Sequence, residues 1–118
     1  VSENKVLAHP SCVDSIPTSA GQEDHVSMGG YSARKGLSIL NNTQRVIAIE
    51  MLNAAQGMDF RAPLKPGKGT AAAFKAYRED VPFYDKDQYM QPLMLKSLEL
   101  VKSGKIIDAV EKEIGELK

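Results

Sequence analysis

Polar side chains that can carry acid–base chemistry stand in a row at Gln22, Glu23, Asp24 and His25. Two are carboxylates and one is an imidazole that titrates near neutral pH, so the run can accept, donate and exchange protons. A loop of Pro, Thr, Ser, Ala and Gly precedes it at 17–21. Such a run is typical either of a helix start or of a functional site.

The two interpretations explain different parts of the pattern. As a helix start, Ser19 or Gly21 is the N-cap, and Glu23 and Asp24 lie in the first turn, where the helix dipole favours negative charge by about 0.3–1 kcal/mol. As a site, the run accounts better for the two glycines at 29–30, since each glycine costs a helix about 1 kcal/mol relative to alanine. The residues alone leave both interpretations open.

The His and Cys residues are too few for a zinc site. The chain has only His9, Cys12 and His25, whereas a tetrahedral zinc site needs four convergent ligands. We therefore expect no metal site. Cys12 cannot form an internal disulfide, which favours a reducing compartment, the cytoplasm.

Length and charge restrict the classes of partner. The chain has 118 residues, the length of one domain, with 15 basic and 15 acidic side chains. This balance leaves no excess positive charge to bind nucleic acid or an anionic membrane. No apolar run reaches the roughly 18–20 residues needed to cross a bilayer. We expect neither kind of partner. Because the first residue is Val1, either an initiator was removed or the sequence is a piece of a longer chain.

The hydrophobic pattern predicts an all-α chain. A loop-rich lead-in, with at most one turn of helix, occupies 1–22, and two core helices at about 23–40 and 44–58 follow within 23–60, separated by a break at 41–43 and with Gly57 ending the second. A Pro/Gly connector then opens the segment 61–118. Helices are predicted at 70–80 with Thr70 as the cap, from 88 or 91 to 103, and at 105–117 after Gly104.

The helix at 44–58 is apolar on most sides. At 100° per residue four of its polar side chains fall within an arc of about 140°, at Arg45, Glu50, Asn53 and Gln56. The other predicted helices are few and more polar than this one. They offer too little apolar surface to bury it, so the rest of that surface must come from elsewhere. This is typical of a fragment of a large helical-bundle enzyme.

Three stretches resemble the histidine ammonia-lyase family. The first begins at His9-Pro10, continues through Val13-Asp14-Ser15-Ile16 and ends with 17–29; it is similar to the family pattern H-P-x-S-V-D-S-I-P-T-S-A-x-Q-E-D-H-V-S-M-G. Residues 48–66 are similar to A-I-E-L-L-x-A-A-Q-G-x-D-F-R-A-P-L-K-P, and 81–87 to V-P-F-Y-x-x-D. Three ordered motifs that cover nearly the whole chain are a far stronger signal than one short pattern.

The resemblance implies an activity that this chain does not complete. Enzymes of this family convert L-histidine to urocanate and ammonia in histidine catabolism, using an electrophilic methylidene-imidazolone group formed from an Ala-Ser-Gly tripeptide. This chain contains no Ala-Ser-Gly, so on the resemblance it is the C-terminal part of the enzyme and inactive alone. The family forms homotetramers whose active sites borrow residues from several subunits, so the remainder of the lyase is the expected partner.

By the same resemblance, Glu23 is the catalytic or substrate-binding residue of this portion. It would face the active-site cavity and meet the imidazole of bound histidine. Gln22 is a second substrate-binding candidate, and Met28 lines either the pocket or the core. Asp24 is expected to orient the loop, and His25 is expected to be structural.

Other functions remain as alternatives. The chain can be a non-catalytic helical interaction module derived from a lyase. It can also belong to a tyrosine or phenylalanine ammonia-lyase or aminomutase. That reading is disfavoured because those enzymes carry a neutral amide in place of Glu23, and an acid suits a basic imidazole better.

Overall fold

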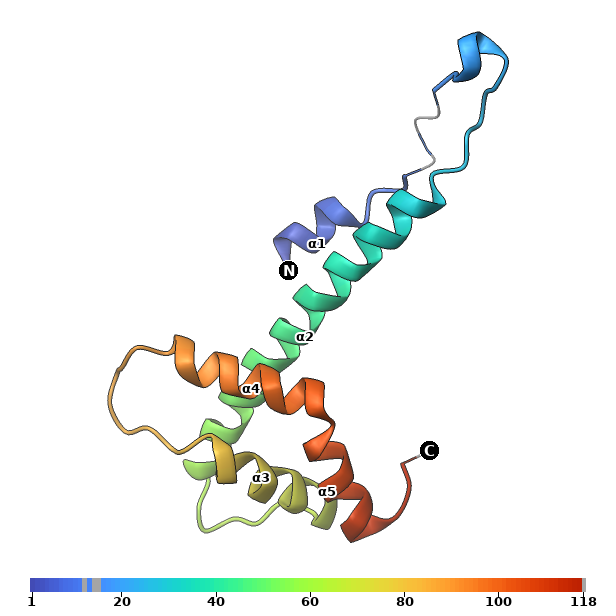
Figure 1. The fold of residues 1–118 in the computed structure, drawn as a ribbon. Helices are drawn as coiled ribbons and strands as arrows, with labels where there is room; N and C mark the ends of the chain where they lie inside the picture. Colours follow the sequence, from blue (N-terminus) through green and yellow to red (C-terminus); the bar gives the residue numbers. More distant parts are fainter. Residues whose placement is uncertain (12, 14–15, 118) are drawn as a thin grey trace. The chain divides into compact units, whose positions relative to one another are not determined.

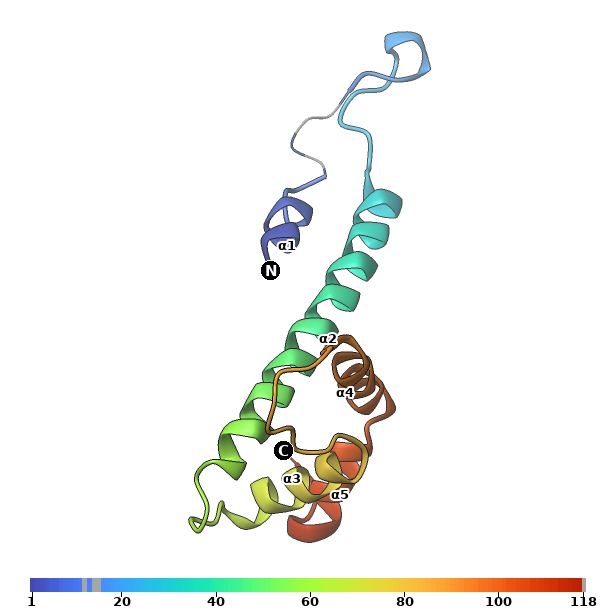
Figure 2. The ribbon, with the colours of Figure 1, turned by 90° about the vertical axis from the view of Figure 1, so that its left-hand side faces the viewer.

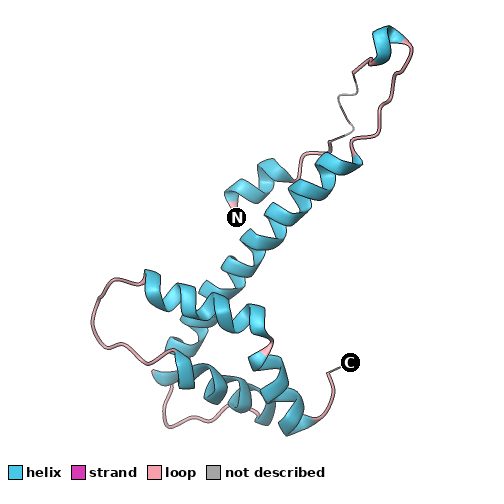
Figure 3. Cartoon of the chain, in the orientation of Figure 1, coloured by secondary structure: helices cyan, strands magenta, loops and turns pink. Residues whose placement is uncertain are grey.

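The computed structural model describes every residue except 12, 14, 15 and 118. Within the described residues the chain consists of helices and loops (Figure 3), which confirms the all-α prediction. The chain folds as two compact units, 1–43 and 44–118. One helix, α2 (Gly29–Asp59), contributes its first part to one unit and its second part to the other.

The first unit contains a short helix beside α2. Helix α1 (Ser2–Leu7) lies alongside the first part of α2 in both ribbon views (Figures 1 and 2). The Nδ2 of Asn42 donates to Glu3 Oε2 at 2.9 Å and to Asn4 Oδ1 at 3.0 Å. Between α1 and α2 lies a loop that includes a tight turn, η1 (Ser19–Gly21).

The helix bounds correct two sequence predictions in this part of the chain. The predicted break at 41–43 is wrong, because these residues lie inside α2. Two of these side chains form hydrogen bonds without breaking the helix: Asn42 bonds to α1, and the Thr43 hydroxyl donates to the Ile39 carbonyl at 2.9 Å. The predicted start near Glu23 is also wrong, since α2 begins at Gly29.

The second unit holds the hydrophobic core. It contains the rest of α2, then α3 (Lys68–Asp80), α4 (Gln91–Ser103) and α5 (Lys105–Ile114). The buried residues of α2 are spaced at helical intervals, as an amphipathic face requires, at Ala48, Leu52, Ala55 and Gln56. Leu52 and Ala55 form one cluster with Tyr77, Val81 and Leu100.

Three buried or half-buried polar side chains in this core, Gln56, Tyr77 and Ser97, form hydrogen bonds. The Gln56 Nε2 donates to the Tyr84 carbonyl at 2.6 Å, and the Tyr77 hydroxyl lies 2.5 Å from Ser97 Oγ. Because Ser97 gives its one proton to the Leu93 carbonyl at 2.8 Å, Tyr77 is the donor in its pair with Ser97. Burial raises the pKa of Tyr77 above its usual value, which keeps the phenol protonated as a donor.

Helix ends in this unit agree with the predictions in part. Helix α4 begins at the second of the two predicted starts, 88 and 91, and ends at 103 as predicted, with Pro92 in its first turn, where proline is tolerated. Gly104 separates it from α5 as predicted, with the left-handed φ of 76° that favours glycine. Three predicted helix ends are wrong: α2 ends at Asp59 and not at Gly57, Gly67 and not Thr70 caps α3, and α5 ends at Ile114, before Gly115.

Candidate functional site

Glu23 lies at the base of a tight turn in the loop between α1 and α2. The backbone N–H of Thr18 donates to the Glu23 carbonyl at 2.8 Å, and the Glu23 N–H donates to the Thr18 carbonyl at 3.2 Å. These two hydrogen bonds form an isolated antiparallel bridge that closes the turn. Figure 1 shows this loop extending beyond the first residues of α2. The bridge fixes the backbone from which the Glu23 side chain projects.

The turn is made of residues in a backbone conformation that L-amino acids rarely adopt. Ser19 and Ala20 have φ values of 52° and 56°, and Gly21 follows with 85°. Only the glycine adopts a positive φ without steric cost. Strained residues of this kind persist where the surrounding structure holds them, and they cluster at functional sites. The strain therefore favours a functional role for this turn.

The carboxylate of Glu23 is held by a side chain, in addition to the hydrogen bonds that fix its backbone. The Thr18 hydroxyl donates to Glu23 Oε2 at 3.0 Å. Glu23 is exposed in the chain, as are Gln22, Asp24 and His25. The result is an acidic side chain on a fixed turn, open to a ligand or to another part of a larger protein.

The structure excludes the helix-start interpretation of the acidic residues. Helix α2 begins six residues after Glu23, and its first turn contains no acidic side chain. His25 has a φ of 49°, which interrupts any helical path from 22 to 29. Neither Ser19 nor Gly21 is the cap of α2. The functional-site interpretation is compatible with this backbone and stays a prediction.

The other predicted residues lie along the same segment. Gln22 follows the turn directly, with its N–H donating to the Ser19 carbonyl at 3.2 Å. Met28 is half-buried at the far end, where its carbonyl accepts from the Ser32 N–H at 2.9 Å in the first turn of α2. The structure thus brings Gln22 and Glu23 together on the turn and places Met28 at the start of the helix.

The sequence pattern did not identify Thr18 as a member of this group. Its pairing with Glu23 depends on a turn that brings residues five apart side by side, and no periodic pattern reveals such a turn. The available signal was composition: the residues at 17–21, Pro, Thr, Ser, Ala and Gly, are typical of a tight turn, and a turn of that length places its two ends in contact.

A shallow hollow in the first unit does not include the predicted site. It measures about 210 Å³ and is lined by α1, the residues just after it, and one face of α2. Lys35 crosses it, with Nζ donating to the His9 carbonyl. This hydrogen bond from Lys35 holds the segment after α1 against α2.

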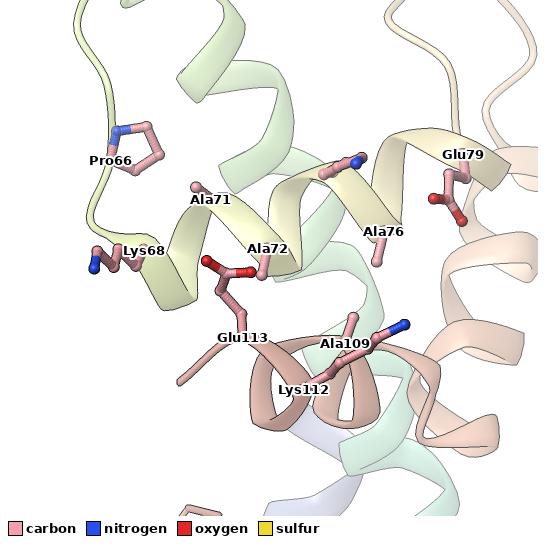
Figure 4. Close-up of a pocket in the computed structure, with 10 residues that line it drawn as sticks. Pro66, Lys68, Ala71, Ala72, Ala76, Glu79, Ala109, Lys112 and Glu113 are labelled. Atoms are coloured by element: carbon pink, nitrogen blue, oxygen red, sulfur yellow. The ribbon is translucent and has the colours of Figure 1, made fainter. Parts of the chain in front are cut away.

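Another hollow lies between α3 and α5 in the second unit. It measures about 650 Å³ and contains none of the predicted site residues. Figure 4 shows an alanine floor, with Ala72 and Ala76 of α3 facing Ala109 of α5. Charged side chains of both signs rim it, at Lys68, Lys75, Glu79, Lys112 and Glu113. A small-residue floor with mixed charges serves helix packing and offers no convergent chemistry.

Side chains that could bind a metal do not gather in this structure. In the part of the chain that it describes, no group of three His, Cys, Asp or Glu side chains converges on a metal-sized space. Cys12, considered above as a ligand and for disulfide pairing, lies outside the described residues, as do Asp14 and Ser15 of the first motif. None of the described helices combines the length and apolar character of a membrane span.

Comparisons with known proteins all find relatives among the amino acid lyases. The family model for aromatic amino acid lyase matches residues 1–79. The chain is 51% identical to a histidine ammonia-lyase of Gloeobacter violaceus over 99% of its own length, which is 23% of that relative. It therefore spans about a quarter of the curated relatives it matches.

Solved structures share the fold as well as the sequence. The chain superposes on histidine ammonia-lyase from Trypanosoma cruzi with a TM-score of 0.87 and 41% identity, over 95% of this chain and 22% of that one. It also superposes on the ergothioneine-degrading ergothionase of Treponema denticola with a TM-score of 0.83 and 34% identity, over 91% and 22%. The family model alone covers more than half of the chain. This chain belongs to the aromatic amino acid lyase family.

Proposed function

We propose that the chain is the C-terminal part of a histidine ammonia-lyase, which converts L-histidine to urocanate and ammonia. The observation that carries this proposal is the carboxylate of Glu23, fixed on a strained turn in a chain 51% identical to a histidine ammonia-lyase. A carboxylate is the acceptor that suits a basic imidazole. The catalytic or substrate-binding role of Glu23 is part of this proposal.

The role of Glu23 follows from the chemistry of the ring. A carboxylate oxygen accepts a hydrogen bond from an imidazole N–H and stabilises positive charge on the ring, by about 1.5–3 kcal/mol for a charge-assisted bond. The fixed turn places the acceptor before the substrate arrives, so little orientation is lost on binding. Gln22, beside it on the turn, is the second substrate-binding residue of the proposal, and Met28 supplies apolar lining.

The electrophile of the reaction must come from another segment. The family's methylidene-imidazolone activates the amino acid for loss of ammonia, and it forms from Ala-Ser-Gly. This chain contains no such tripeptide, so none of its residues can form the group. The chain contributes the acceptor for the imidazole, and it is inactive without the segment that carries the electrophile.

Association with that segment and with further subunits is supported by exposed apolar surface. The second part of α2 exposes Val46, Ile47 and Ile49, each at more than a third of its full area. Exposed apolar side chains gathered on one helix indicate a surface that another element covers. We propose that the rest of the lyase and its other subunits in a homotetramer cover it. The single cysteine of the sequence supports the reducing cytoplasm as the place of action.

The experiment is a substrate and variant test in the complete enzyme that carries this chain. Urocanate formation from histidine is followed by its ultraviolet absorbance, with ergothioneine, tyrosine and phenylalanine as competing substrates. We expect histidine to be turned over, and Glu23→Gln to lower kcat/KM by about tenfold to hundredfold because an amide lacks the charge of the acceptor.

Two results would contradict the proposal. If the enzyme turned over ergothioneine or an aromatic amino acid but not histidine, it would be a lyase of this family with a different substrate. Absence of any ammonia release in the complete enzyme would favour the non-catalytic interaction module. The matched control is Asp24→Asn, which removes a neighbouring negative charge from the same exposed loop and is expected to have the smaller effect.

A further inference from the structure

The Thr18 side chain is the group in the described structure that constrains the orientation of the Glu23 carboxylate. Its hydroxyl donates to Oε2 at 3.0 Å, and the two residues also exchange both of their backbone hydrogen bonds. No other hydrogen bond to this carboxylate occurs among the described residues. Thr18 therefore holds one carboxylate oxygen and leaves the other available to a ligand.

We propose that Thr18 is the positioning residue for Glu23 in the lyase reaction. The inference rests on the proposed function, because it assumes that Glu23 accepts a hydrogen bond from the substrate. With Oε2 occupied by the threonine hydroxyl, the carboxylate cannot rotate freely, and Oε1 is presented to the imidazole N–H. A pre-oriented acceptor is worth more than a free one, because no reorganisation accompanies binding.

The backbone explains why the Thr18 side chain can orient the Glu23 carboxylate. The antiparallel bridge puts residues 18 and 23 opposite each other across the turn, so their side chains leave the same face. Ser19 and Ala20 adopt the left-handed region to close the turn between them. The strain in the turn thus serves to bring a donor beside the acidic side chain.

The test uses the complete enzyme and a cycle of variants at both positions. Thr18→Val keeps the shape of the side chain and removes the hydroxyl, whereas Thr18→Ser retains the hydroxyl. We expect Thr18→Val to lower kcat/KM for histidine by about tenfold, as for loss of one hydrogen bond to a charged group. Thr18→Ser should remain within about threefold of the wild type, because it keeps that hydrogen bond.

The decisive readout is the coupling between the two positions. In a Glu23→Gln background the carboxylate is already lost, so Thr18→Val should cost little more, and the two losses should be far from additive. A merely structural role of Thr18 gives additive losses. Ser27→Ala is the matched control, because it removes an exposed hydroxyl from the same loop and Ser27 shares no hydrogen bond with Glu23 in the structure.

Every outcome decides between the claims. Wild-type activity of Thr18→Val, or a full tenfold loss also in the Glu23→Gln background, overturns the role of Thr18 while leaving that of Glu23 intact. Wild-type activity of Glu23→Gln overturns the proposed role of Glu23 and with it that of Thr18. Should Thr18→Val not accumulate as folded enzyme, Thr18→Ala replaces it, since it removes the hydroxyl, adds no bulk and keeps the backbone bridge.

Discussion

At the residue scale, Lys105 shows how a single charge links two helices. It is the first residue of α5, and its Nζ lies 2.6 Å from Asp80 Oδ2 and 2.9 Å from Glu79 Oε2, both in the last turn of α3. The hydrogen bond from Lys105 lowers the pKa of Asp80 below its usual value. The bonds to Asp80 and then Glu79 raise the pKa of Lys105.

The sign of these shifts predicts a pH window for the link. Because the pKa of Asp80 is lowered in the folded chain, its contribution is present above about pH 4 and is lost as acid protonates the carboxylate. Because the pKa of Lys105 is raised, its contribution is lost only in strong alkali, above about pH 10. The link therefore operates across the neutral range.

Replacement of Lys105 by methionine should loosen the start of α5 most at neutral pH. We expect Lys105→Met to speed amide hydrogen exchange in the peptide that contains residues 105–110 at pH 7, and the difference from the wild type to shrink in acid, as protonation of Asp80 removes the link. Lys102→Met, in the last turn of α4, is the control and should leave this peptide unchanged. Equal exchange of Lys105→Met and wild type at pH 7 would contradict the prediction.

At the element scale, α2 shows what sequence patterns miss. Asn and Thr are weak helix formers that compete for backbone hydrogen bonds, so three of them in a row predict a break. In the structure the competing bonds are made elsewhere: Asn42 pairs with Glu3 and Asn4 of α1. A tertiary contact from residues nearly forty positions away satisfies the side chain, and local propensity contains no information about it.

Removal of the Asn42 amide should release α1 while leaving α2 intact. Alanine is the better helix former, so Asn42→Ala costs α2 nothing in propensity, but α1 loses two hydrogen bonds. We expect severalfold faster amide exchange across 2–8 and unchanged exchange across 36–50 in the complete protein. Asn41→Ala is the matched control. Faster exchange across 36–50 would instead mean that Asn42 stabilises α2 itself.

Other elements could be predicted because their signals are local. Pro92 in the first turn and Gly104 at the end define α4, and the continuous apolar pattern of 44–58 predicts the second part of α2 as a helix. For the site, the motif singled out the segment of Gln22, Glu23 and Met28. The same residues could not show whether Glu23 begins a helix or closes a turn, because that depends on the left-handed backbone at 19, 20 and 25. Thr18 could not be identified for the same reason.

At the scale of the whole molecule, the burial of α2 is incomplete. The sequence pattern predicted that residues 44–58 need apolar surface from elsewhere. In the structure Ala48, Leu52 and Ala55 are buried, whereas Val46, Ile47 and Ile49 remain 36%, 41% and 39% exposed. One face of the helix therefore packs within the chain and another does not. The chain spans 23% of a relative's length, so a complete enzyme of that length has ample further surface to cover the second face.

A charge on the uncovered face should prevent assembly of the complete enzyme. If Ile47 is buried by the rest of the lyase or by another subunit, Ile47→Glu places an unpaired charge in an apolar contact, which is strongly unfavourable. We expect a lower molar mass in size-exclusion chromatography with light scattering, or insoluble protein, and loss of urocanate formation. Gln88→Glu introduces the same charge at an exposed position of the loop before α4 and should assemble normally. An Ile47→Glu enzyme with wild-type mass and activity would show that this face stays in solvent, and the exposed side chains would then have to be explained without a covering partner.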